Sequence, residues 1–114
     1  MITLGKAAGM SESEILLRRL DGHLAGLRLD GDPREYPVAE RLDAALRRLI
    51  AETASASAAD RARVRAAVHY FVLRPSRGER RAHRPMTEDV RVINEILRLV
   101  DRPDLIVNLT PEPA

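Results

Sequence analysis

The chain has 114 residues, of which 45% are hydrophobic and only three are aromatic, and it contains no cysteine. This length predicts one domain, and the lack of cysteine excludes disulfides and thiolate metal sites. No apolar run reaches the roughly 18 residues of a membrane span, and the first ten residues do not read as a signal peptide. We therefore expect a cytoplasmic protein whose aliphatic core is built from packed helices.

Positive charge is concentrated in one part of the chain. Eighteen arginines against a single lysine are typical of a GC-rich bacterial genome, so the total alone says little. Their distribution is more informative, because residues 61–85 hold eight arginines and one acid while the segments on either side are net negative. This quarter of the chain is the one with a charge pattern that suggests a ligand.

The first predicted helix begins at Ser11, which with Glu14 forms the S-x-x-E capping box. Gly22 and Gly26 each disfavour the helix by about 1 kcal/mol relative to alanine. We expect the helix to end between Leu20 and Leu27. Its apolar stripe consists of Ile15, Leu16, Leu20, Leu24 and Leu27.

The second predicted helix begins at Pro37, because a proline at the first helical position loses no hydrogen bond. Asp43 with Arg47, and Arg48 with Glu52, have the four-residue spacing of surface ion pairs. The buried stripe of this helix is expected to be Val38, Leu42, Ala45, Leu46, Leu49 and Ile50.

The third predicted helix spans residues 58–73 and follows the small-residue connector 53–59, with Ser57 as its cap. Its outer side carries Arg61, Arg65 and His69, which follow each other at steps of four residues, and Arg63 lies nearby. The inward-facing residues are expected to be Val64, Ala67, Val68, Phe71 and Val72.

The fourth predicted helix has Thr87 as its cap and places Glu88 and Asp89 against the positive end of its dipole. Arg91 and Glu95 have the spacing of another surface pair. The broad apolar face of this helix, typical of a central position, consists of Val92, Ile93, Ile96, Leu97 and Val100.

Pro103 is expected to end this helix, and residues 104–110 then form a short apolar extended segment. The segment either packs along the bundle or pairs with another chain. Self-association would use this tail or an exposed stripe of the first helix. The tail residues available for it are Leu105, Ile106, Val107 and Leu109.

The loop between the third and fourth helices, residues 74–86, is strongly basic. Together with the third helix it could bind nucleic acid or another polyanion, with an affinity that falls as salt rises. The alternative is a solvated connector, since the loop lacks aromatic side chains for base stacking and the connections are too long for a helix-turn-helix. The candidate binding residues are Arg61, Arg65, Arg74, Arg77, Arg80, Arg81 and Arg84.

Enzymatic and metal-binding functions have no motif in this sequence. His23, His69 and His83 lie in three separate elements without the spacing of metal ligands. The phosphate-binding glycine loops and the nucleophile elbow are also absent. We therefore expect no catalytic site, no cofactor and no metal.

Two segments, "RAAVHYFVLRP" and "EDVRVINEIL", resemble the YkvA-like family of small bacterial helical proteins. Tyr70 and Phe71 match the aromatic pair that ends a helix in that family, and Glu88 and Asp89 stand where its paired acids would be. The family's aspartate-and-proline loop motif and its glycine before the acids are missing, so no role of the acidic loop carries over. Over about residues 60–100 the resemblance implies a helical fold and a bacterial origin, in a family whose function is unsettled.

Taken together, these patterns predict an all-α, single-domain, four-helix bundle-like fold. Residues 1–10 would form an N-terminal arm, and residues 103–114 would form an extended tail. The preferred function is a non-enzymatic interaction or adaptor module that self-associates or binds a protein partner. The alternative is a nucleic-acid-binding protein that uses the arginines between residues 61 and 84.

Overall fold

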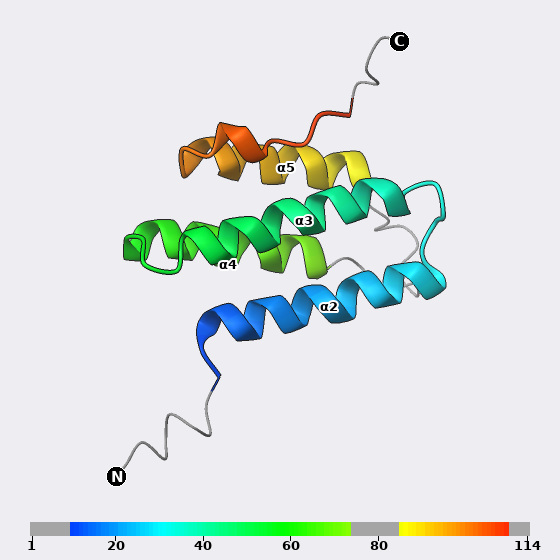
Figure 1. Cartoon of the computed structure of the whole chain (residues 1–114). Helices are drawn as coiled ribbons and strands as arrows, with labels where there is room; N and C mark the ends of the chain where they lie inside the picture. The colour runs from blue at the N-terminus through cyan, green and yellow to red at the C-terminus, as the bar shows by residue number, and fades with distance from the viewer. Residues whose placement is uncertain (1–9, 74–84, 110–114) are drawn as a thin grey trace.

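The computed structural model describes residues 10–73 and 85–109, and its regular elements in these ranges are all helical. Within the described residues, four α-helices and one short 3₁₀ turn follow each other along the chain (Figure 1). This confirms the prediction of an all-α, four-helix bundle-like fold. The elements are α2 (Glu12–Asp30), α3 (Tyr36–Glu52), α4 (Ala58–Val72), α5 (Met86–Leu99) and the turn η2 (Pro103–Leu105).

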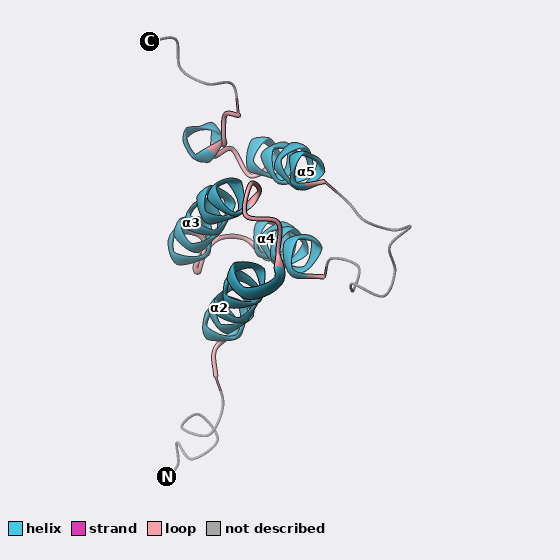
Figure 2. Cartoon of the chain, turned by 90° about the vertical axis from the view of Figure 1, so that its right-hand side faces the viewer, coloured by secondary structure: helices cyan, strands magenta, loops and turns pink. Residues whose placement is uncertain are grey.

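The four helices are arranged in three layers. Helices α3 and α4 lie side by side in the middle, α2 lies on one side of them, and α5 with η2 lies on the other (Figure 2). The core fills the space between these layers with aliphatic side chains and one aromatic ring. Its fully buried large hydrophobic residues are Leu20, Leu42, Leu46, Leu49, Val68, Phe71, Ile93 and Leu97.

Helix α2 begins where the sequence predicts but ends later. The Ser11 hydroxyl accepts the Glu14 N–H at 3.2 Å, and the Glu14 carboxylate accepts the Ser11 N–H at 3.0 Å, so the capping box is complete. The predicted end between Leu20 and Leu27 is wrong, because the helix continues to Asp30. Leu24 and Leu27 still pack against the core, and this packing outweighs the two glycines.

The N-termini of α3 and α4 follow their sequence patterns closely. Helix α3 begins one residue before Pro37, so that proline is second rather than first in the helix. Ser57 caps α4 by accepting the Asp60 N–H at 3.1 Å, as predicted.

The sequence predicted that Thr87 caps α5, but the N-terminus of this helix is capped by a distant residue. Pro85 is the N-cap, and the Met86 N–H donates to the carboxylate of Glu35 at 3.1 Å. Met86 is the first residue of α5 and is buried. The predicted loop 74–86 therefore extended one residue too far into this helix. Asp89, in the same first turn, is fully buried.

The predicted ion pair between Arg91 and Glu95 does not form. Arg91 instead donates to Glu88 at 2.7 Å, and Glu95 accepts from Arg98 at 3.3 Å. Helical side chains lean toward the helix N-terminus, so each arginine reaches the acid three residues before it. These pairs are exposed and contribute little to stability.

Helix α5 ends in a Schellman motif, before the predicted stop at Pro103. Asp101 adopts φ 60°, the left-handed conformation. The Arg102 N–H donates to the Leu97 carbonyl at 2.7 Å, and the Asp101 N–H donates to the Arg98 carbonyl at 3.1 Å. Pro103 begins η2 and turns the chain back along the bundle.

The segment after η2 is docked on the bundle by a buried side-chain amide. The amide of Asn94 donates to the Val107 carbonyl and accepts the Val107 N–H, both at 2.9 Å. Leu105 and Val107 are buried, and Arg41 donates to the Asn108 carbonyl at 2.7 Å. The sequence left open whether the tail packs along the bundle or pairs with another chain. From Leu105 to Asn108 it packs along its own bundle.

Arg102 ties the turn η2 to the end of α3. Its guanidinium pairs with Asp104 at 2.7 Å and with Glu52 at 2.5 Å. Hydrogen bonds from Arg48 and from Arg102 lower the pKa of Glu52, and the bond from Arg102 lowers the pKa of Asp104. Both carboxyl pKa values are lowered on folding. The two pairs therefore stabilise the fold above the ordinary carboxyl pKa, and this stabilisation is lost as pH falls through the pKa values of the folded state.

The predicted surface pair of Asp43 and Arg47 is in fact a junction between α2 and α3. Asp43 is only 6% exposed, and its Oδ2 accepts from Arg47 Nε at 2.7 Å. Arg47 also reaches across to Asp21 of α2 at 2.5 Å. The second oxygen of Asp43 is buried and has no hydrogen-bond partner among the residues that the structure describes, so Arg47 is the group that compensates this carboxylate. The other predicted pair, Arg48 with Glu52, forms at 2.8 Å on the surface.

Candidate functional site

The arginines predicted on α4 divide into paired and unpaired residues. Arg65 forms an ion pair with Glu12 of α2 at 2.5 Å, and Arg63 forms one with Asp60 at 3.0 Å. Arg61 makes no ion pair within the described residues, and its Nε donates to the Ala56 carbonyl at 3.1 Å. The structure therefore does not assemble these residues into one open basic face.

The remaining five predicted binding residues lie outside the described residues. Binding of a polyanion stays a prediction that rests mainly on this part of the sequence. These five residues are Arg74, Arg77, Arg80, Arg81 and Arg84.

The tail residues proposed for self-association have separate environments. Leu105 and Val107 belong to the core, whereas Ile106 is half-buried and Leu109 is exposed at the surface. Self-association through the tail could use only the last two side chains without opening the core.

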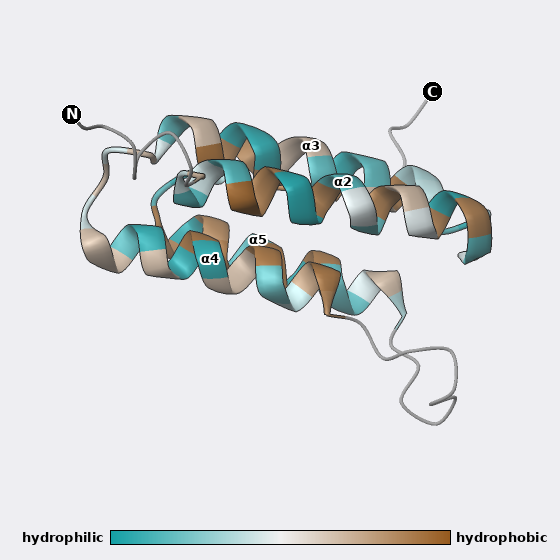
Figure 3. Ribbon diagram, turned by 90° about the horizontal axis from the view of Figure 1, so that it is seen from below, coloured by the Kyte–Doolittle hydropathy of each residue, from teal (hydrophilic) through white to brown (hydrophobic). Residues whose placement is uncertain are grey.

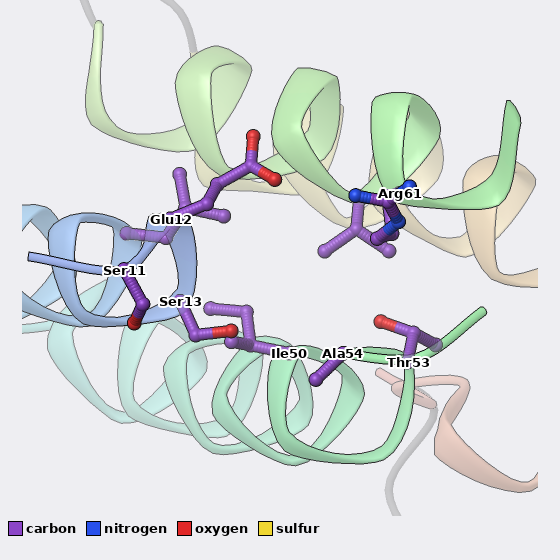
Figure 4. A pocket seen from close by; sticks show the side chains of 9 residues that line it. Ser11, Glu12, Ser13, Ile50, Thr53, Ala54 and Arg61 are labelled. Atoms are coloured by element: carbon purple, nitrogen blue, oxygen red, sulfur yellow. The ribbon is translucent and has the colours of Figure 1, made fainter. Parts of the chain in front are cut away.

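A pocket of about 370 Å³ lies where the start of α2, the end of α3 and the start of α4 meet. Leu16, Ile50 and Val64 form its apolar wall. In Figure 4 the hydroxyls of Ser13 and Thr53 point toward each other across the opening. The pocket is lined by Ser11, Glu12, Ser13, Leu16, Ile50, Thr53, Ala54, Arg61 and Val64.

The side of α2 that points away from the bundle forms a second feature, which we call the outer face of α2. All of its side chains are exposed, and Figure 3 shows this helix from its open side, with brown and pale residues between teal ones. Leu29 is 82% exposed and Ile15 is 37% exposed, at opposite ends of the face. The outer face of α2 consists of Ile15, Arg18, Arg19, Gly22, Ala25, Gly26 and Leu29.

The two glycines of this face have no steric reason to be glycine within the described part of the chain. Among residues 10–73 and 85–109, a Cβ atom built on Gly22 or on Gly26 meets no atom within 4 Å. Each glycine still costs about 1 kcal/mol of helix stability relative to alanine. A glycine at such a position allows another backbone to approach the helix closely, so the surface has the shape of a helix-packing site without a partner.

Within residues 10–73 and 85–109, histidines and acids do not gather in a group of three or more that could hold a metal ion. In the same ranges, the helices lack the combination of length and apolarity that a membrane crossing requires.

The comparisons with known proteins leave these two features to be interpreted from their geometry alone. No family model matches the chain, and neither the curated proteins nor the solved structures contain a match. The resemblance of residues 60–100 to the YkvA-like family stays a prediction.

Sequence reasoning missed the pocket and the role of Asn94. The pocket joins three segments that are far apart in the sequence, and no local pattern brings them together. Asn94 did carry a pattern, because it is a polar residue directly beside Ile93 and one turn after Val90, both of which are buried. A polar residue at such a position is expected to have buried hydrogen-bond partners.

Proposed function

We propose that this protein is a non-enzymatic helical interaction module that self-associates through the outer face of α2. The observation that carries the proposal is an exposed face with a hydrophobic residue at each end and two glycines between them. A second copy of the chain is the partner that this face fits best, for the two reasons given below.

The first reason is that the face is complementary to itself. Ile15 lies seven residues before Gly22, and Leu29 lies seven residues after it, which is close to two helical turns in each direction. An antiparallel pair of α2 helices related by a twofold axis at Gly22 would bring Ile15 of each copy against Leu29 of the other. The two exposed apolar side chains would then cover each other, and the glycines would allow the helices to pack closely.

The second reason is charge. At 100° per residue, Arg19 and Asp30 lie on the same edge of α2, and neither makes an ion pair within the described residues. In the antiparallel arrangement, Arg19 of one copy lies about 7.5 Å along the axis from Asp30 of the other, a gap that an arginine side chain can span. Electrostatic complementarity of this kind fixes the register of an interface more than it adds affinity.

Charge reversal tests the proposal. We expect the wild-type chain to form a dimer in sedimentation equilibrium between about 1 and 200 μM. The single variants Arg19→Asp and Asp30→Arg should each weaken the affinity of the dimer about tenfold or more. Each substitution brings two like charges together, one from each copy, at both ends of the interface. The double variant Arg19→Asp/Asp30→Arg restores opposite charges and should recover most of the affinity.

Ala66→Asp is the matched control, because Ala66 is exposed on α4, away from this face. It should leave the dimer unchanged, and circular dichroism should show that all variants keep their helix content. A wild-type chain that stays monomeric over the whole range would contradict the proposal. So would a dimer that the single charge reversals do not weaken.

A further inference from the structure

The pocket at the end of the bundle is a separate feature from the outer face of α2 and combines two kinds of surface. Its wall is made of Leu16, Ile50 and Val64, each contributed by a different helix and each at most 5% exposed. Its opening carries the hydroxyls of Ser13 and Thr53. At about 370 Å³ the pocket falls within the usual range of small-molecule sites.

Arg61 gives the pocket its charge. Its Nε is held by the Ala56 carbonyl at 3.1 Å, which fixes the side chain while the two terminal nitrogens remain for another acceptor. Arg61 has no acidic partner within the described residues, and Figure 4 shows its guanidinium on the α4 side of the opening. The guanidinium is the group best suited to bind a carboxylate with two parallel hydrogen bonds.

The Glu12 carboxylate limits which anions the pocket can accept. Glu12 also lines the pocket, but it is paired with Arg65 of α4 at 2.5 Å. The two groups largely neutralise each other, so the pocket has about one unit of positive charge, from Arg61. A singly charged anion is compensated by this charge, whereas a phosphate dianion would be left partly unpaired beside a carboxylate.

We propose that this pocket binds a small monocarboxylic acid with a short apolar chain. The carboxylate would pair with Arg61 and accept a hydrogen bond from the Ser13 hydroxyl, since the Thr53 hydroxyl donates its proton to the Leu49 carbonyl at 2.7 Å. The apolar chain would lie against Leu16, Ile50 and Val64. This assignment goes beyond the proposed self-association and does not depend on it.

Hexanoate is a suitable probe, and its binding can be measured by backbone amide NMR of the full chain. We expect saturable shifts of the Ser13, Thr53 and Arg61 amides, with a dissociation constant on the order of 1 mM. Hexylamine and hexanol have the same number of carbon atoms without the carboxylate, and both should bind at least about tenfold more weakly. Hexyl phosphate tests the charge argument and should also bind more weakly than hexanoate.

Two variants and one control separate the contributions to binding. Arg61→Gln should lose about tenfold or more in hexanoate affinity, whereas Arg63→Gln removes an arginine of the same helix that does not line the pocket and should bind normally. Ala54→Phe places a ring at an exposed lining position and should block binding without touching the charge. Unfolding midpoints check that each variant is folded. No saturable shift with the wild-type chain, or equal affinity in Arg61→Gln, would overturn the proposal.

Discussion

Replacing Asn94 with leucine is expected to destabilise the fold by about 2–4 kcal/mol, because the buried N–H and C=O of Val107 each lose their hydrogen-bond partner. This is a large part of the 5–15 kcal/mol that is typical of a domain of this kind. If the segment around Val107 detaches instead, the cost becomes the lost burial of Leu105 and Val107. Denaturant unfolding measures the total, and amide hydrogen exchange at Val107 shows whether the segment detaches.

Two further variants of α5 test this explanation. Asn94→Asp keeps an acceptor for the Val107 N–H but sets a carboxylate against the Val107 carbonyl, so it should also be destabilising at neutral pH. Glu95→Ala changes the adjacent, exposed residue and should alter stability by less than about 0.5 kcal/mol. If Asn94→Leu changed stability as little as Glu95→Ala, the amide would not be what anchors the segment.

Replacing Arg47 with methionine is expected to cost about 2–3 kcal/mol, because it leaves the carboxylate of Asp43 buried and uncompensated. Methionine retains much of the apolar stem of arginine, so the lost charge dominates the effect. The loss should be smaller than for a fully buried pair, since the Arg47 side chain is 35% exposed. Denaturant unfolding at neutral pH measures it.

The double variant Asp43→Ala/Arg47→Met removes both charges and is expected to be more stable than Arg47→Met alone, although each change on its own is destabilising. Asp21→Ala is the control, because Asp21 is the exposed acid of this junction and should cost less than about 1 kcal/mol. Additive effects of the Asp43 and Arg47 substitutions would mean that the two residues are not coupled.

The sequence predicted the helices well because their signals are local. The capping box at Ser11 and the cap at Ser57 each depend on residues within one turn, and the apolar stripes identified most of the core. Local signals misled at Gly22 and Gly26, where packing of the following leucines extends α2 to Asp30, and at Thr87, which does not cap α5.

The tertiary roles of polar residues could not be predicted in the same way. Spacing suggested a surface pair for Asp43, but its burial depends on how α2 packs across α3. The cap of α5 comes from Glu35, some fifty residues away in the chain. The sequence suggested an exposed stripe of this helix but not the outer face of α2 itself. Its pattern assigned Ile15 to the apolar stripe, whereas Ile15 is exposed, and Leu29 lies beyond the predicted end of the helix.

Disulfide cross-linking at Gly22 tests the central claim of self-association most directly. The chain contains no cysteine, so Gly22→Cys introduces a single thiol, at the position where the proposed twofold axis brings the two helices together. Ala66→Cys, exposed on α4, is the control. The proposal predicts that Gly22→Cys oxidises rapidly to a covalent dimer at low protein concentration, whereas Ala66→Cys stays mostly monomeric. Equal and slow cross-linking of the two variants would contradict it.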